Sequence, residues 1–170
     1  SRGIDSNSVV YNFSGFKKKV LEIKNKFNLL SLVETYLPGK EYSVGILQDN
    51  TNGTLIAMPI EIIIKKNREG HCILDFNVKK DDKEKVIAVT DTKIFKKLAE
   101  LGKEAFKALG GKSLGRIDIK MNHKGVPHFM EANLMPGLRK GYFYRSCLLN
   151  LDMTYEDMIF NIANTGLSSS

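Results

Sequence analysis

The sequence lacks any apolar run long enough to cross a membrane, because a membrane-spanning helix needs about 20 consecutive apolar residues. Its longest run extends from Met58 to Ile64 and is interrupted by Pro59 and Glu61, which favours a buried strand. The polar N-terminus shows no signal peptide, and a start at Ser1 without methionine indicates a processed chain or a fragment. We therefore expect no membrane partner.

Cysteine is also scarce, with Cys72 and Cys147 as the only two residues of this type. Their spacing fits neither a metal site nor a disulfide framework, so we expect free, buried thiols and a cytoplasmic location. The histidines His71, His123 and His128 show no metal-ligand pattern, and no serine or cysteine stands in a nucleophile motif. The sequence therefore gives no indication of a histidine or cysteine metal site or of a covalent nucleophile.

No compact basic stripe is present, although Lys and Arg outnumber Asp and Glu by 26 to 19, which gives a formal net charge of +7. The lysines are scattered without interleaved aromatic residues, and no nucleic-acid-binding motif occurs. We therefore expect no nucleic-acid partner. Solvated faces account for most of this charge, and a phosphate-bearing ligand is a second use for some of it.

Three helices are predicted from caps and apolar periodicity. Ser14 is a candidate N-cap for a helix from about Gly15 to Asn28. A second helix runs from Asp91 to Leu109, where Gly110-Gly111 ends it in the left-handed conformation that glycine favours. A third begins near Thr154, with Asp157 at the reciprocal position of a capping box. The buried face of the second helix is expected to comprise Ile94, Leu98, Leu101, Ala105 and Ala108.

The strand pattern predicts an α+β fold with a mostly antiparallel sheet, because strands and helices do not alternate strictly. Residues 29–36 are apolar and β-prone, and Pro38-Gly39 ends them as a turn. Hairpin loops are expected at 49–53 and 122–125. The expected strands are 41–47, 54–64, a short one near Ile73, 114–121 and 126–133.

The last of these hairpins carries most of the polar chemistry. A turn centred on His123-Lys124 places Arg116 opposite Glu131 and Asp118 opposite Phe129, with Asp118 diagonal to Glu131. Alternation then gives a core face of Ile117, Ile119, Met121, Met130 and Ala132 and a polar face of Arg116, Asp118, Glu131 and Asn133. Three oxygen-bearing side chains suit Mg²⁺. The alternative is an ordinary solvent-facing side of a hairpin.

Two segments of this hairpin resemble a known signature. Gly115-Arg116-Ile117-Asp118, followed by Glu131-Ala132-Asn133-Leu134-Met135-Pro136-Gly137, is similar to the G-R-x-D … E-x-N-x-x-P-G pattern of D-alanine–D-alanine ligases, which belong to the ATP-grasp superfamily. The resemblance implies that Asp118, Glu131 and Asn133 bind Mg²⁺, with Mn²⁺ as an alternative ion. It also implies that Arg116 contacts a phosphate or the tetrahedral intermediate.

Earlier segments resemble the ATP-binding parts of the same family. Residues 33–44 are similar to its hinge, which implies that Glu34, Thr35, Tyr36 and Leu37 contact adenine and that Glu41 binds the ribose hydroxyls. Asp75 to Lys79 is similar to its D-Y-x-x-K segment, which implies that Lys79 contacts the ATP phosphates. Residues 1–4 are similar to the end of its glycine-rich phosphate loop. Without the resemblance, Glu41 and Lys79 would be interpreted as surface residues.

The resemblance implies the C-terminal part of an ATP-grasp domain, with packed helices on a mostly antiparallel sheet. Residues 1–33 would be a remnant of the central lid subdomain, and residues 34–170 the C-terminal subdomain with the Mg·ATP site. The implied activity is an ATP-dependent carboxylate–amine ligation through an acylphosphate, as in peptidoglycan biosynthesis. The expected substrates are small molecules, namely an amino acid or dipeptide-type carboxylate and an amine, and a homodimer is left open.

The chain also departs from the family pattern. Lys80 stands where a tyrosine is expected, and residues 138–142 replace the M-T-x-x-S segment, which puts Tyr142 at the serine position. One alternative is therefore a nucleotide-binding module or pseudo-enzyme without ligase activity, and another is a basic structural protein. We further expect the 170-residue chain to fold but to be catalytically inert alone, because much of the family's architecture is missing from it.

Overall fold

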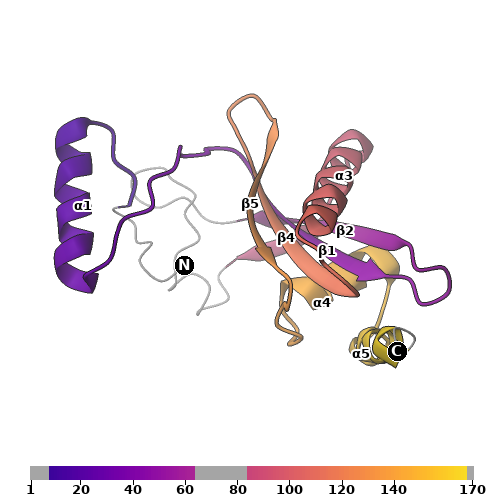
Figure 1. Ribbon diagram of the computed structural model, residues 1–170. Helices are drawn as coiled ribbons and strands as arrows, with labels where there is room; N and C mark the ends of the chain where they lie inside the picture. The colour runs from indigo at the N-terminus through magenta and orange to yellow at the C-terminus, as the bar shows by residue number, and fades with distance from the viewer. Residues whose placement is uncertain (1–7, 64–83, 168–170) are drawn as a thin grey trace. The chain divides into compact units, whose positions relative to one another are not determined.

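A computed structural model describes residues 8–63 and 84–167 (Figure 1). The chain divides into two compact units, one of Ser1–Pro38 with Ile64–Glu84 and one of Gly39–Ile63 with Lys85–Ser170. The strand expected near Ile73 and the residues Cys72, Lys79 and Lys80 lie outside the described residues. Within the described ranges, no helix combines the length and apolar character that spanning a membrane requires.

The described part of the first unit contains the helix α1, Phe13–Phe27. Its N-cap is Asn12, whose side-chain oxygen accepts a hydrogen bond from the Gly15 amide at 2.8 Å. The prediction of Ser14 as the cap was therefore wrong. The cap lies two residues earlier in the sequence, because the side-chain oxygen of Asn12 accepts from a backbone N–H of the first turn. Helix α1 ends at Asn28 in the left-handed conformation, and none of its residues is buried.

The apolar stretch 29–36 forms no strand, contrary to its β-prone composition. Leu30 and Leu32 are 96% and 84% exposed. Strand propensity mainly expresses packing against neighbouring strands, and none of the described strands pairs with this segment. Composition alone therefore did not decide its conformation.

The second unit is built on a five-stranded sheet in the order β3-β2-β1-β4-β5 (Figure 1). Every neighbouring pair is antiparallel, which confirms the predicted sheet type. The short strand β3 was not predicted, because its charged surroundings indicated a loop. The strand bounds are β1 Glu41–Gln48, β2 Leu55–Ile63, β3 Lys85–Ala88, β4 Leu114–Met121 and β5 Pro127–Asn133.

Within the described part of the second unit, three helices accompany the sheet: α3 Thr92–Ala108, α4 Tyr142–Leu151 and α5 Tyr155–Leu167. Helix α3 begins after Asp91, whose carboxylate accepts from the amides of Lys93 and Ile94, and Gly110 follows it with φ of +69°. Helix α5 begins with the predicted capping box between Thr154 and Asp157. Helix α4 was missed, because its N-cap Gly141 provides no side-chain hydrogen bond.

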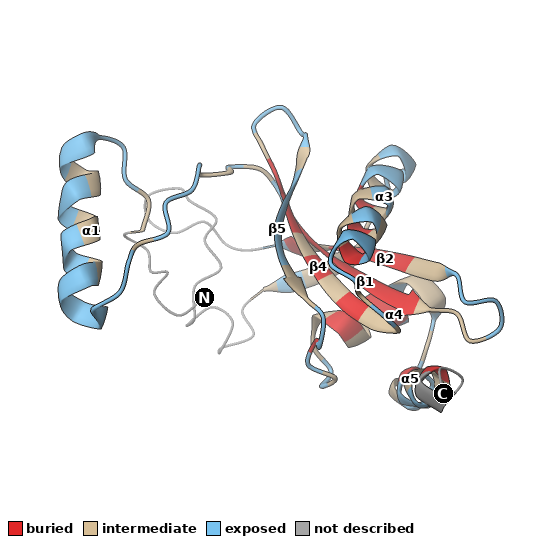
Figure 2. Cartoon of the chain, in the orientation of Figure 1, coloured by how far each residue is buried: buried red, intermediate tan, exposed pale blue. Residues whose placement is uncertain are grey.

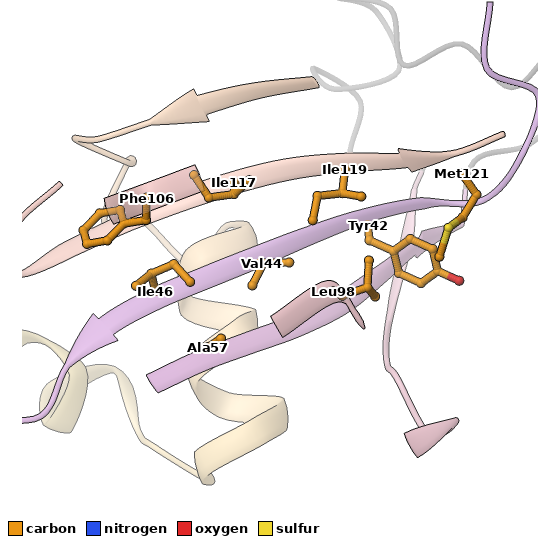
Figure 3. Close-up of a cluster of buried hydrophobic side chains, with 9 residues drawn as sticks. All are labelled: Tyr42, Val44, Ile46, Ala57, Leu98, Phe106, Ile117, Ile119 and Met121. Carbon is orange, nitrogen blue, oxygen red and sulfur yellow. The ribbon is translucent and has the colours of Figure 1, made fainter. Parts of the chain in front are cut away.

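Both faces of the sheet are buried over β1 (Figure 2). On one face, alternate residues of β1 and β4 pack against α3, as Figure 3 shows. This first core comprises Tyr42, Val44, Ile46, Ala57, Leu98, Phe106, Ile117, Ile119 and Met121. The second core, on the α4 and α5 side, comprises Leu47, Met58, Phe143, Cys147 and Met158.

Helix α3 buries a slightly different face from the one expected. Leu98 is fully buried as predicted, and Ile94, Leu101 and Ala105 are partly buried against the same core. Gly102 and Phe106 are also buried, whereas Ala108 is exposed. A Cβ at Gly102 would lie 2.9 Å from Cγ1 of Val44, which is closer than van der Waals contact permits. The glycine therefore allows α3 to approach β1 closely.

Phe106→Ala should lower the free energy of unfolding by about 3–5 kcal/mol, because it removes a fully buried ring and leaves a cavity. Phe160→Ala is the matched control, since Phe160 is 69% exposed and its truncation should change the value by no more than about 0.5 kcal/mol. Urea unfolding followed by circular dichroism measures both. Equal losses in the two variants would contradict the placement of Phe106 in the core.

Candidate functional site

The turn of the β4–β5 hairpin sets the pairing of its two strands. The Asn122 side-chain oxygen accepts from the amides of Lys124 and Val126 at 2.8 and 3.0 Å, and Gly125 has φ of +71°. Asn122 also pairs with Val126 through its own amide, so three residues form the loop. The predicted turn centred on His123-Lys124 is therefore one residue too short.

A β-bulge shifts the pairing again farther along the hairpin. Ile119 pairs with Phe129, but Asp118 pairs with Glu131, so that Met130 has no partner of its own on β4. Met130 is 42% exposed, and its predicted place in the core face was wrong. The bulge inserts one extra residue into β5. The prediction assumed regular alternation of side chains along the strand and therefore did not include this residue.

The observed register corrects the predicted pairs but keeps the predicted polar face. Asp118 lies opposite Glu131, where Phe129 was expected, and Arg116 lies opposite Asn133, where Glu131 was expected. Residues directly opposite each other in an antiparallel pair project to the same side of the sheet. All four predicted polar residues of the hairpin thus occur as two adjacent pairs on one face.

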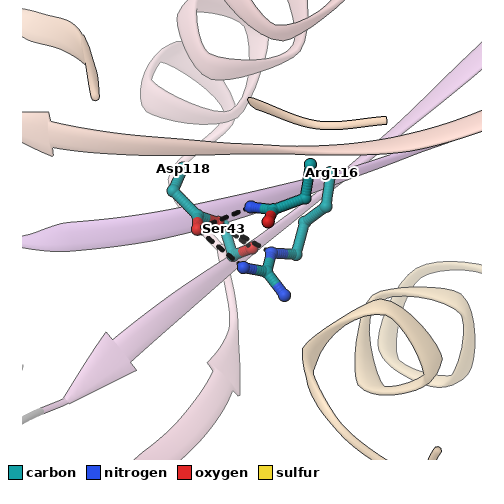
Figure 4. A network of polar contacts seen from close by, with 4 residues as sticks. Ser43, Arg116 and Asp118 are labelled. Atoms are coloured by element: carbon teal, nitrogen blue, oxygen red, sulfur yellow. Dashed lines mark hydrogen bonds and ion pairs between the residues drawn. The ribbon is translucent and has the colours of Figure 1, made fainter. Parts of the chain in front are cut away.

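Asp118 is the most heavily hydrogen-bonded side chain of this group (Figure 4). Its Oδ1 accepts from Ser43 Oγ at 2.8 Å and from Arg116 Nε at 2.9 Å. Its Oδ2 accepts from a terminal nitrogen of Arg116 at 2.8 Å and from the amide nitrogen of Asn133 at 3.5 Å. The Arg116 contact is bidentate and charge-assisted, which makes it both strong and directional.

Strand β1 adds a second polar row to the same face. Its register with β4 places Glu41 opposite Lys120, Ser43 opposite Asp118 and Gly45 opposite Arg116. Lys120 Nζ donates to Glu41 Oε2 at 3.1 Å, and the two side chains are only 10% and 17% exposed. We call this same-face set the polar floor; it comprises Glu41, Ser43, Arg116, Asp118, Lys120, Glu131 and Asn133.

Not every residue proposed from the sequence belongs to this set. Glu34, Thr35, Tyr36 and Leu37 lie in the first compact unit, and Lys79 is outside the described residues. Their contacts with a nucleotide stay predictions. Within the polar floor, Glu131 is exposed.

The donor set of the polar floor suits a hard cation, because Asp118, Glu131 and Asn133 offer two carboxylates and an amide oxygen. No cluster of three or more His, Cys, Asp or Glu side chains suited to a metal occurs within residues 8–63 and 84–167. Each oxygen of Asp118 already accepts two hydrogen bonds, which nearly fills its acceptor capacity. A cation at Asp118 would therefore displace at least one of these donors, and Asn133 would turn its carbonyl oxygen inward.

Three residues near the predicted site escaped the sequence analysis as functional candidates. Ser43 and Lys120 join the polar floor through the β1–β4 pairing, which connects strands far apart in the sequence. Tyr142, the first residue of α4, places its ring 5.5 Å from the guanidinium carbon of Arg116. A guanidinium over an aromatic ring is a favourable contact, so Tyr142 helps to hold Arg116.

The one cysteine among the described residues, Cys147 in α4, is buried and free, as predicted. Burial raises the pKa of its thiol to about 12. The thiol is therefore protonated at neutral pH and is a poor nucleophile.

Comparison with known proteins identifies similar sequences and folds. Residues 7–164 match the family model described as D-ala D-ala ligase C-terminus. A D-alanine–D-alanine ligase from Streptococcus pyogenes serotype M49 (strain NZ131) is 27% identical over 146 residues, which cover 84% of this chain and 40% of that protein. The chain thus spans about two-fifths of the length of that relative.

Solved structures agree on the fold. The D-alanine–D-alanine ligase from Bacillus anthracis complexed with ATP gives a TM-score of 0.70 at 18% identity, over 94% of this chain and 48% of that one. A biotin carboxylase–beta-gamma-ATP complex from Campylobacter jejuni gives a TM-score of 0.55 at 14% identity, over 89% of this chain and 31% of that one. The expected α+β fold of the C-terminal part of an ATP-grasp protein is confirmed.

Ser43→Ala should lower the free energy of unfolding by roughly 1.5–3 kcal/mol, because it removes a buried hydrogen bond to the charged Asp118. Ser146→Ala is the matched control, since Ser146 is equally buried but its hydroxyl has no hydrogen-bond partner among the described residues. That change should cost no stability. Chemical denaturation of both variants measures the difference, and equal effects would argue against a strong Ser43–Asp118 bond.

Proposed function

The chain belongs to the family of D-alanine–D-alanine ligase C-terminal domains, and we propose that the protein it forms part of uses ATP to join a carboxylate to an amine. The observation that carries this proposal is the polar floor, where Arg116 and Asp118 lie opposite Asn133 and Glu131. The order and spacing of these four residues match the family signature. Their convergence on one rigid sheet face supports a role in binding phosphates through a divalent cation.

In this proposal Asp118, Glu131 and Asn133 would hold Mg²⁺ or Mn²⁺, which supplies positive charge against the ATP phosphates. Arg116 would exchange Asp118 for a phosphate oxygen or for the oxyanion of the tetrahedral intermediate. In this exchange the guanidinium keeps an anionic hydrogen-bond partner, because the phosphate or oxyanion replaces the carboxylate of Asp118. The same movement frees the oxygens of Asp118 for the cation.

The proposed reaction has two steps. A carboxylate oxygen of the first substrate attacks the γ-phosphorus of ATP, the bond to the departing ADP oxygen breaks, and an acylphosphate forms. The amine nitrogen of the second substrate then attacks the acyl carbon, and inorganic phosphate and a proton leave. Arg116 stabilises the negative charge that develops in both steps.

The nucleotide-binding roles of the remaining predicted residues complete the proposal. Glu41 would accept hydrogen bonds from the ribose hydroxyls, since a carboxylate accepts from two neighbouring donors. Residues 34–37 would contact adenine and Lys79 the phosphates, with residues 1–33 as a lid remnant. The substrates would be an amino acid or dipeptide-type carboxylate and an amine, in cytoplasmic peptidoglycan synthesis.

The second candidate is a nucleotide-binding module that has lost ligase chemistry. The contact of Tyr142 with Arg116 supports it, because a bulky ring stands where the family places a serine for the second substrate. Product assays of the full-length protein with a panel of amino acids separate the two candidates. Turnover with any amine acceptor would exclude the binding-only function.

Asp118→Asn and Glu131→Gln should each lower turnover of the full-length protein by roughly a hundredfold or more, because each removes a charged ligand of the proposed cation. Glu100→Gln is the control, since Glu100 is exposed on α3. ADP release at several Mg²⁺ and Mn²⁺ concentrations measures the effect. Full activity in both Asp118 and Glu131 variants would refute the metal assignment.

The 170-residue chain alone should bind Mg·ATP weakly and release no phosphate. Phosphoryl transfer depends on positioning and closure more than on any one residue, and the chain spans about two-fifths of the relative from Streptococcus pyogenes. Calorimetric titration measures the binding, and a coupled assay measures phosphate. Amino-acid-dependent ADP production by the chain alone would show this prediction to be wrong.

A further inference from the structure

We propose that Lys120 is a positioning residue for the nucleotide sugar, which holds the carboxylate of Glu41 and thereby sets the preference for ribose over 2′-deoxyribose. The inference rests on the proposed function, in which Glu41 binds the sugar. Lys120 has no role in the signature that identifies the family. Its assignment comes from the pairing of β1 with β4.

The contact between these two side chains is short and shielded from water. Lys120 Nζ lies 3.1 Å from Glu41 Oε2, and only 10% and 17% of the two side chains are exposed. The residues are direct partners across two strands near the middle of the sheet. A pair anchored in this way has few alternative geometries, because both backbones are fixed by the sheet.

The orientation of the Glu41 carboxylate follows from this contact. Its Oε2 accepts a hydrogen bond from Lys120. A carboxylate has two oxygens and about four acceptor positions, so Oε1 can still accept from a ligand. An anchored Oε2 fixes the direction in which Oε1 presents its lone pairs. A fixed acceptor distinguishes a sugar that carries both hydroxyls from one that lacks the 2′-hydroxyl, since the analogue leaves the acceptor unpaired.

The placement of Lys120 along β4 fits a nucleotide lying on the polar floor. Lys120 and Asp118 are separated by one residue and project to the same face, which puts their Cα atoms about 7 Å apart. Asp118 belongs to the proposed cation and phosphate site, and Glu41 to the proposed sugar site. Lys120 is therefore adjacent both to Glu41, directly across the strand pair, and to Asp118, two residues along β4. These neighbours belong to the parts of the floor that would meet the sugar and the phosphates of one nucleotide.

The chain offers a closely matched control in the pair Lys40–Glu61. Lys40 Nζ lies 2.9 Å from a Glu61 oxygen, and Glu61 is the direct partner of Tyr42, whose side chain belongs to the core beneath α3. This second Lys–Glu pair is therefore on the opposite face of the sheet. Lys40 is also 64% exposed, so its loss should leave the polar floor unchanged.

The test compares the affinities of the full-length protein for Mg·ATP and Mg·2′-deoxy-ATP by isothermal titration calorimetry. The unmodified protein should bind ATP about tenfold more tightly, as expected for one hydrogen bond to a charged acceptor. Lys120→Met should bring this ratio close to one, and Lys40→Met should leave it unchanged. Circular dichroism and the melting temperature check that each variant folds.

Lys120→Gln keeps a neutral donor and provides a second test if Lys120→Met does not fold. Its ratio should fall between the roughly tenfold ratio of the unmodified protein and the ratio close to one of Lys120→Met. An unchanged ratio in a folded Lys120 variant, or an equal loss in Lys40→Met, would overturn the inference. Binding of ATP without sugar preference in the unmodified protein would overturn it while the proposed function stands, whereas no binding of ATP at all would remove both.

Discussion

The antiparallel pairing of β1 with β4 is the constraint on which the rest of the second unit depends. The two strands are separated in sequence by β2, β3 and α3, yet they lie side by side at the centre of the sheet. Alternation along this pair sends Val44 and Ile117 to the core under α3 and Ser43 and Asp118 to the other face. One backbone register therefore fixes both the packing and the polar floor.

The ion pair between Arg116 and Asp118 occupies both of these charged groups of the polar floor in this structure. Each partner neutralises the other, so an anion at Arg116 and a cation at Asp118 are each opposed by the existing bond. Binding both together replaces that bond with two new ones of similar kind. The floor is thus suited to a ligand that brings a cation and phosphates at the same time, and less suited to either one separately.

The sequence predicted the caps of α3 and α5, but it missed the cap of α1, helix α4 and the pairings of distant strands. Caps and periodicity located α3, and the capping box at Thr154 located the start of α5, because these signals act within a few residues. The Asp118–Glu131 register was missed, since neither the three-residue loop nor the bulge at Met130 leaves a mark in the alternation. Ser43 and Lys120 were missed because their partners come from another strand. Helix α4 was missed because Gly141 provides no capping side chain. The roles of the site residues could not be predicted from spacing alone and depended on the resemblance to the family.

The bulge at Met130 also affects how readily another strand could pair with β5, at the edge of the described sheet. Strand β5 is the last strand in the described sheet and pairs there only with β4, and its Phe129 and Met130 are 43% and 42% exposed. An edge strand that has no second partner among the described strands and exposes apolar side chains is a template for strands of other molecules and hence for aggregation. The extra residue breaks the even spacing of N–H and C=O groups that an incoming strand would need. The irregularity that brings Glu131 opposite Asp118 thus also makes this edge a poorer template for an added strand.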